Sequence, residues 1–229
     1  MLKLSVTPAG TAARPAVSGG LPVIFVIDYD VAIREAVCEL LENDGHTVET
    51  YSTSEEFLES YQPGRAGCLL VDAIFPRLNG LELLQQLREA GDRMPAIINT
   101  GNSDVPMVVR AMKVGAFDFI EKPIGCEVLL ASIELALAQS RALDRISALH
   151  ERAAGLFASL TDRQHQIMAL VLAGNPSKNI AADLGISRRT VENHRAAIMK
   201  KTGSKSLPAL ARMAIGADSH HVSGHAGVW

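Results

Sequence analysis

The stretch "LPVIFVIDYD", residues 21–30, decides how the first half of the chain folds. Its apolar run, residues 23–27, ends at once in two aspartates separated by a tyrosine: Asp28, Tyr29 and Asp30. A short unbroken apolar run is typical of a strand buried on both faces, as in a parallel sheet. The two carboxylates then lie at the exposed end of that strand, where chemistry gathers in such sheets.

The same strand-and-helix pattern repeats along the chain. Further short runs are "TVETY" (47–51), "CLLV" (68–71), "AIIN" (96–99) and "FDFI" (117–120), with helical patterns near 31–43, 54–61, 80–90, 104–114 and from 126 onward. Parallel neighbours need helical crossovers, so this alternation predicts an α/β doubly wound (βα)5 domain with helices on both faces of the sheet.

The last of these helical patterns is unusually long. Neither proline nor glycine occurs from Cys126 to Ala154, and apolar residues recur at helical spacing. The pattern predicts a helix that leaves the first domain as a linker and stops at Gly155. The alternative is a helix that ends near Ser140 and is followed by a loop.

The remaining sequence predicts four short helices. They are "LTDRQHQIMALVLAG" (160–174) with a capping box of Thr161 and Gln164, "PSKNIAADLG" (176–185), "ISRRTVENHRAAIMKKTG" (186–203) with Ser187 as N-cap, and "SLPALARMAI" (206–215). We therefore expect a disordered tail (1–21), a first domain (22–140), a helical linker (141–156), an all-α four-helix domain (157–216) and a flexible tail (217–229).

Charge differs between the two predicted domains. The net charge is −3, but residues 22–145 hold 10 Lys/Arg against 20 Asp/Glu, whereas residues 157–216 hold 9 against 3. The basic second domain is a candidate for binding a polyanion.

Composition excludes several classes of protein. The most apolar segment, "EVLLASIELALA", is interrupted by Glu127 and Glu134, and the first twenty residues lack the apolar region of a signal peptide. We expect a soluble cytoplasmic protein without a membrane span. The cysteines, Cys38, Cys68 and Cys126, lack metal-ligand spacing and are expected to be reduced core residues.

Polar residues follow four of the five predicted strands. Asp28 and Asp30 follow the first, Asp72 the third, Thr100 the fourth and Lys122 the fifth. In a doubly wound sheet these side chains converge on one pocket. A carboxylate nucleophile, acids that hold Mg²⁺, a hydroxyl and a lysine are the groups that phosphoryl transfer requires.

One family resemblance rests on the first strand. "VIFVIDYDVAI" resembles the opening signature of haloacid-dehalogenase-type phosphatases, which implies Asp28 as nucleophile and Asp30 as acid, with Thr100 and Lys122 as later motifs. Such enzymes need a further acidic pair after the lysine, where this chain offers only "PIGCEV". The resemblance also leaves Asp72 without a role.

A second resemblance covers about residues 22–216. "CLLVDAIFPRLNGLELLQQL", "PAIINTGNSDVPMVVRAMKVGAFDFIEKPI" and "LTDRQHQIMALVLAGNPSKNIAADLGISRRTVENHRAAIMKKTG" together resemble the FixJ-type two-component response regulators. The family has a receiver domain followed by a LuxR-type helix-turn-helix domain. The resemblance implies a transcriptional regulator rather than an enzyme, with a sensor histidine kinase and double-stranded DNA as partners.

This second resemblance implies a role for each pocket residue. It assigns phosphate acceptance to Asp72, switching to Thr100 and Phe119, phosphate pairing to Lys122, and Mg²⁺ binding to Asp28, Asp72 and the Ile74 carbonyl. It also implies a cis peptide between Lys122 and Pro123.

Tyr29 departs from the family's pattern. There the first strand ends in two adjacent acids, the second of which binds Mg²⁺, and counting back from Arg34 puts Tyr29 at that place. A phenol with a pKa of about 10 is a poor Mg²⁺ ligand. We expect weakened Mg²⁺ binding, with two possibilities: slow or unusually regulated phosphorylation, or a receiver that no longer uses phosphate.

The helix in "SRRTVENHRAAIMKK" is the predicted DNA-reading helix. One stripe of this helix is expected to pack on the domain and another to be free to enter a major groove. The packing stripe comprises Val191, Ile198 and either His194 or Arg195, and the free stripe comprises Arg188, Arg189, Glu192, Asn193 and Ala196. Arginine, asparagine and glutamate can read bases, whereas Lys178, Thr190, Lys200 and Lys201 suit phosphates. The alternative is a solvated cationic helix.

"LPALARM" (207–213) resembles the helix through which LuxR-type domains pair, which implies a homodimer on a palindromic site.

Overall fold

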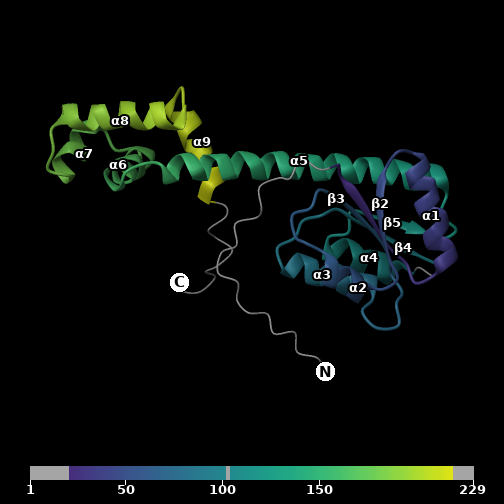
Figure 1. Cartoon of the computed structure of the whole chain (residues 1–229). Helices are drawn as coiled ribbons and strands as arrows, with labels where there is room; N and C mark the ends of the chain where they lie inside the picture. Colours follow the sequence, from purple (N-terminus) through teal and green to yellow (C-terminus); the bar gives the residue numbers. More distant parts are fainter. Residues whose placement is uncertain (1–20, 102–103, 219–229) are drawn as a thin grey trace. The chain divides into compact units, whose positions relative to one another are not determined.

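The computed structural model describes residues 21–101 and 104–218. The chain divides between Arg145 and Ile146 into two compact units (Figure 1). Within the described ranges, no helix combines the length and apolar character that a membrane span requires.

The first unit contains one parallel five-stranded sheet in the order β2-β1-β3-β4-β5. The strands are β1 (Val23–Ile27), β2 (Thr47–Tyr51), β3 (Gly67–Asp72), β4 (Ala96–Thr100) and β5 (Asp118–Glu121). The helices are α1 (Val31–Asn43), α2 (Ser54–Ser60), α3 (Gly80–Glu89), α4 (Val105–Val114) and α5 (Cys126–Ala158). The predicted doubly wound fold is confirmed.

Alternating side chains of the central strands build a separate apolar core on each face of the sheet. Phe25 and Leu69 belong to the core that α2, α3 and α4 cover. Their neighbours Ile24 and Leu70 belong to the core that α1 and α5 cover. This double burial explains why the strands are continuous apolar runs.

Gly80 fixes the distance between the start of α3 and the end of β3. A Cβ atom at this position would lie 2.1 Å from the carbonyl oxygen of Asp72. Only glycine permits this approach, so the helix start holds the backbone at the strand end in place.

Helix α5 continues without interruption to Ala158, so the alternative of a loop after Ser140 is wrong. The predicted stop at Gly155 is also wrong. Ala153 and Phe157 are buried in the core of the second unit. Their burial outweighs the roughly 1 kcal/mol that a glycine costs inside a helix.

The second unit is helical. After the end of α5 it contains α6 (Asp162–Leu172), α7 (Ser177–Asp183), α8 (Arg188–Thr202) and α9 (Leu207–Asp218). The predicted capping box is present, because Thr161 and Gln164 exchange side-chain and backbone hydrogen bonds. Ser187 caps α8 as predicted, accepting from the backbone N–H of Thr190.

Two further predictions need correction. Helix α9 extends to Asp218, so the chain is still helical where the C-terminal tail was expected to begin; residues 1–20 and 219–229 lie outside the described residues. All three cysteines are free, but Cys126 is exposed at the first position of α5 rather than in the core. Burial raises the pKa of the Cys68 thiol to about 12.

Candidate functional site

The ends of β1, β3 and β5 bring two carboxylates and one ammonium group together. Lys122 Nζ donates to Asp28 Oδ2 at 2.8 Å and to Asp72 Oδ2 at 2.7 Å. Asp28 is 1% exposed and Asp72 is 2% exposed. Three residues distant in sequence therefore form one buried charge cluster, as the strand-end argument predicted.

The charge of Lys122 is stabilised by its two partners. Burial alone would lower the pKa of Lys122, but the hydrogen bonds that it donates to the carboxylates of Asp28 and Asp72, and the attraction of their charges, outweigh burial and raise that pKa. The lysine neutralises one of the two carboxylate charges. The remaining negative charge favours binding of a cation.

Backbone groups hold the other oxygen of each carboxylate. Asp72 Oδ1 accepts from the N–H of Ile74 at 2.9 Å, and Asp28 Oδ1 accepts from the N–H of Asp30 at 2.9 Å. The guanidinium of Arg34 donates to the Asp28 carbonyl at 2.6 Å. Both carboxylates are thus oriented by the loops that follow their strands.

The two predicted switch residues lie on β4 and β5. Thr100 is the last residue of β4 and is fully buried, and its carbonyl accepts from the N–H of Lys122 at 2.8 Å. Phe119 is half-buried opposite Ile98 and packs against the core covered by α2, α3 and α4. The peptide between Lys122 and Pro123 is cis, as the family resemblance implied.

Tyr29 and Asp30 lie outside this charge cluster. Tyr29 is 56% exposed, and its ring makes an edge-to-face contact with Phe75 at 6.2 Å between centroids. The carboxylate of Asp30 accepts from the N–H groups of Ala32 and Ile33 and so caps α1. This capping role is sufficient to account for an aspartate at position 30, so no role in the pocket is needed to explain it.

The donor atoms of the pocket suit Mg²⁺. Carboxylate and carbonyl oxygens are the protein ligands that Mg²⁺ prefers, and it commonly keeps several waters. Asp28 and Asp72 provide two carboxylates, and the loop after β3 carries the Ile74 carbonyl. Tyr29 adds no carboxylate to this set.

The second candidate site is the outer face of α8. Its inner residues Val191 and Ile198 are buried, at 0% and 2% exposure. The predicted free stripe is exposed throughout, and comprises Arg188, Arg189, Glu192, Asn193 and Ala196. The predicted division of the helix into a packing face and a free face is confirmed.

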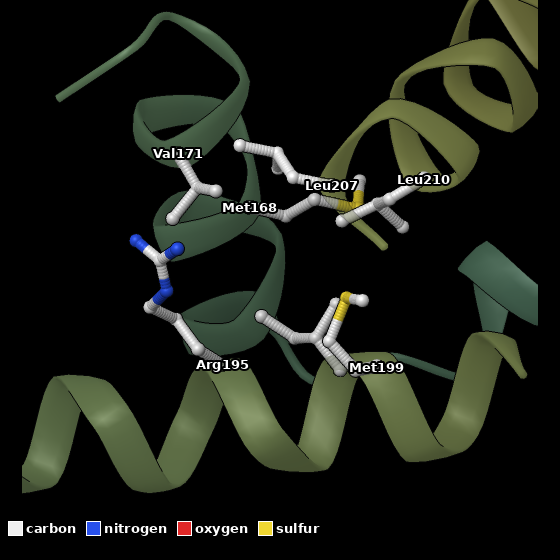
Figure 2. A pocket seen from close by; sticks show the side chains of 7 residues that line it. Met168, Val171, Arg195, Met199, Leu207 and Leu210 are labelled. Carbon is white, nitrogen blue, oxygen red and sulfur yellow. The ribbon is translucent and has the colours of Figure 1, made fainter. Parts of the chain in front are cut away.

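The inner face of α8 packs against α6 and α9 around an apolar pocket of about 120 Å³ (Figure 2). Met168 and Val171 come from α6, Met199 from α8, and Leu207 from α9. Figure 2 shows the side chain of Arg195 directed toward α6, so this residue lines the pocket on the packing side of α8.

The cations around α8 differ in their contacts. Lys178 and Lys200 are exposed, whereas Lys201 Nζ donates to the Ser159 carbonyl and to Gln164 Oε1, each at 3.0 Å. Lys201 therefore ties α8 to the start of α6, a role that the sequence did not reveal.

Arg163 also has a structural role that the local sequence does not reveal. Its guanidinium donates to the Leu184 carbonyl at 2.8 Å and so fixes the turn between α7 and α8. On α8 itself, Arg188 Nε lies 2.9 Å from Glu192 Oε1. A base contact by either side chain would compete with this exposed ion pair.

Comparison with known proteins identifies a family for each part of the chain. The response regulator receiver domain matches residues 24–134, and the bacterial regulatory proteins of the luxR family match residues 158–214. The transcriptional regulatory protein FixJ of Azorhizobium caulinodans is 40% identical over 195 residues, covering 85% of this chain and 92% of FixJ. This chain belongs to the FixJ-type response regulators. The response regulator protein TodT of Pseudomonas putida is 37% identical, with 83% and 84% of the two chains covered.

Solved structures of response regulators support the same assignment. StyR aligns with a TM-score of 0.75 at 37% identity, covering 86% of this chain and 99% of StyR. Full-length FixJ from B. japonicum aligns with a TM-score of 0.51 at 37% identity, covering 86% and 98%. The protein is a DNA-binding transcriptional response regulator of a two-component system. Its receiver domain implies a histidine kinase partner, and receivers as a class bind Mg²⁺ at this acidic pocket.

Proposed function

We propose that Asp72 accepts the phosphoryl group from a sensor histidine kinase and that this modification controls DNA binding by α8. The observation that carries the proposal is the contact of Lys122 Nζ with Asp72 Oδ2 at 2.7 Å. Once a phosphoryl group is attached to Asp72, the ammonium group of Lys122 can pair with a phosphate oxygen instead of the carboxylate.

The other pocket residues have supporting roles in this proposal. Asp28, Asp72 and the Ile74 carbonyl would hold Mg²⁺, which neutralises phosphate charge when bound. The Thr100 hydroxyl binds a phosphate oxygen, and Phe119 changes rotamer in response. Full burial of Thr100 and half-burial of Phe119 support such a coupled pair.

The DNA-binding part of the proposal rests on the exposed face of α8. We assign the receiver to residues 22–140, the linker to 141–156 and the DNA-binding domain to 157–216, in a cytoplasmic protein. Proposed base contacts come from Arg188, Arg189, Glu192 and Asn193, and phosphate contacts from Lys178, Thr190 and Lys200. Exposed Leu207 and Ile215 on α9 support pairing of two copies through this helix.

A second candidate function is a receiver that controls DNA binding without phosphate. The observation in its favour is Tyr29, whose exposed ring contacts Phe75 where the family has a metal-binding acid. Lys122 already bridges Asp28 and Asp72, so the pocket is held together by direct contacts.

The phosphatase alternative has less support. It requires Asp30 as a catalytic acid, but the carboxylate of Asp30 caps α1. Relatives that cover most of the chain are transcriptional regulators, so a role without catalytic turnover is part of our proposal.

Phosphorylation of full-length protein by a small phosphodonor tests these alternatives. We expect one phosphoryl group per chain with Mg²⁺ present, complete loss in Asp72→Asn, and retention in Asp30→Asn, because asparagine also caps helices. Tighter binding of the phosphorylated protein to DNA would support control by phosphate.

Each alternative predicts a different result. Unmodified protein under all conditions, together with full DNA binding by Asp72→Asn, would favour the phosphate-independent receiver. Multiple-turnover hydrolysis of phosphate esters that survives Asp72→Asn and disappears in Asp28→Asn would favour the phosphatase.

A further inference from the structure

A second cluster of metal-ligating side chains lies in the first unit, away from Lys122. It comprises Asp44, at the C-terminal cap of α1, His46, before β2, and Glu134, on α5. One ligand atom from each residue lies within 4.8 Å of the other two. The residues are separated by up to ninety positions, so folding alone brings them together.

Backbone hydrogen bonds hold the α1 side of this cluster. Gly45 adopts a left-handed φ of +88°, and the N–H of His46 donates to the Leu41 carbonyl at 3.0 Å. This turn places Asp44 and His46 on either side of a helix-terminating glycine.

The apolar core holds the α5 side. Leu41, near the end of α1, and Ile133, which precedes Glu134, are both fully buried in the same core cluster. The ligand atoms are therefore attached to rigid, packed segments.

The imidazole of His46 brings to the cluster a buried nitrogen that makes no hydrogen bond within the part of the chain that the structure describes. Nε2 is buried and has no hydrogen-bond partner among the described residues. It lies 3.3 Å from Asp44 Oδ2, but without hydrogen-bond geometry. A buried polar atom without a partner is unfavourable, as is close approach of two carboxylates. A cation between the three groups would remove both costs.

We propose that Asp44, His46 and Glu134 bind a divalent cation of the Zn²⁺ type. One imidazole nitrogen and two carboxylate oxygens suit Zn²⁺ and its first-row neighbours better than Mg²⁺, which prefers oxygen alone. Three protein ligands leave the fourth position of a tetrahedral site for water. The bound ion links the turn after α1 to α5 and stabilises the first unit.

Zn²⁺ titration of full-length protein by calorimetry, with thermal melts of the same samples, tests this site. We expect Zn²⁺ to raise the unfolding temperature of the first unit. His46→Gln and Glu134→Gln should each weaken one binding event by at least about tenfold, since even changes outside the ligand sphere cost that much. Glu134 is exposed, so its substitution keeps the test valid should His46→Gln fold poorly.

Matched controls separate this site from other metal-binding groups. Glu127→Gln on the same helix and His165→Gln in the second unit should bind Zn²⁺ like wild type. Asp72→Asn should retain the event, which distinguishes it from the acidic pocket, and the histidines of the C-terminal tail are common to all variants. Zn²⁺ affinity and melting shift unchanged in both His46→Gln and Glu134→Gln would overturn the proposal. So would the absence of any Zn²⁺-dependent shift in wild type.

Discussion

Lys122 Nζ lies 2.7 Å from Asp72 Oδ2, a contact between the ends of two strands that are not neighbours in the sheet. Replacing this lysine by methionine keeps the aliphatic stem but leaves Asp28 and Asp72 buried without a counter-charge. We expect Lys122→Met to lower the free energy of unfolding by about 3 kcal/mol or more in chelator. Urea denaturation measures the change.

Mg²⁺ and a matched lysine provide the controls for this prediction. Mg²⁺ should stabilise Lys122→Met more than wild type, because the cation replaces the missing charge. Lys113→Met, at an exposed position on α4, should change stability by less than about 0.5 kcal/mol. A Lys122→Met protein as stable as wild type would mean that the pocket carboxylates do not repel each other.

Arg65 and Glu49 give a prediction about pH. Two hydrogen bonds from Arg65, at 2.6 and 2.8 Å, hold the pKa of Glu49 below its ordinary value. The pair therefore contributes its full stability above the glutamate pKa of the unfolded chain, about 4.3, and loses it as pH falls through the lowered folded value. At pH 7 we expect Arg65→Met to cost about 0.5 kcal/mol, because both side chains are about one-third exposed and solvent screens the pair.

Arg65 can stabilise the fold in two ways: through its ion pair with Glu49, which depends on pH, and through its contact with the ring of Phe25, which does not. The guanidinium carbon lies 4.9 Å from the ring centroid, and arginine stays charged at every pH used. Urea denaturation at pH 7 and near pH 3 should show a smaller cost for Arg65→Met at the lower pH. Exposed Arg93→Met should show no such difference, and an equal cost at both pH values for Arg65→Met would assign its effect to ring packing alone.

Local pattern predicted most of the fold because buried strands leave a strong signal. Each predicted strand lies within one residue of its observed position. For β1, β3 and β4 the reason is burial on both faces, which makes them largely apolar runs such as "VIFVI". Thr161 and Ser187 were likewise identifiable, because capping depends on residues only three positions away.

The failures share a physical cause, which is dependence on tertiary contacts. Gly155 does not end α5, because its neighbours Ala153 and Phe157 are buried in a core that the local sequence cannot reveal. The bonds of Lys201 to the start of α6 are equally invisible locally. Asp44, His46 and Glu134 carry no spacing motif, since their proximity depends on packing of α1 with α5.

The exposed face of α8 predicts two classes of DNA contact. Arg189→Ala or Asn193→Ala should weaken binding to the specific site by about 1–3 kcal/mol and random DNA much less. Lys178→Ala should weaken both alike and reduce the slope of log K against log salt by about 1. Fluorescence anisotropy over a salt series measures both effects. Equal losses on both DNAs for all three variants would remove the base-reading role.

Tyr29→Asp is expected to strengthen Mg²⁺ binding to the receiver. The new carboxylate would stand where the family has a metal ligand, beside Asp28 and Asp72, and should speed phosphorylation by a small phosphodonor. In chelator the added charge should destabilise the fold by like-charge repulsion. Thermal melts with and without Mg²⁺, plus a phosphorylation time course, measure these effects.

Tyr29→Asn separates the effect of charge from loss of the ring. It removes the edge-to-face contact with Phe75, worth about 0.5–1.5 kcal/mol, without adding a carboxylate. Tyr29→Asp should therefore be less stable than Tyr29→Asn in chelator. It should also gain more stability on adding Mg²⁺, because the ion binds only the folded state. If wild type binds Mg²⁺ and is phosphorylated as well as Tyr29→Asp, the missing acid has no functional cost, because water can occupy its place in the coordination sphere.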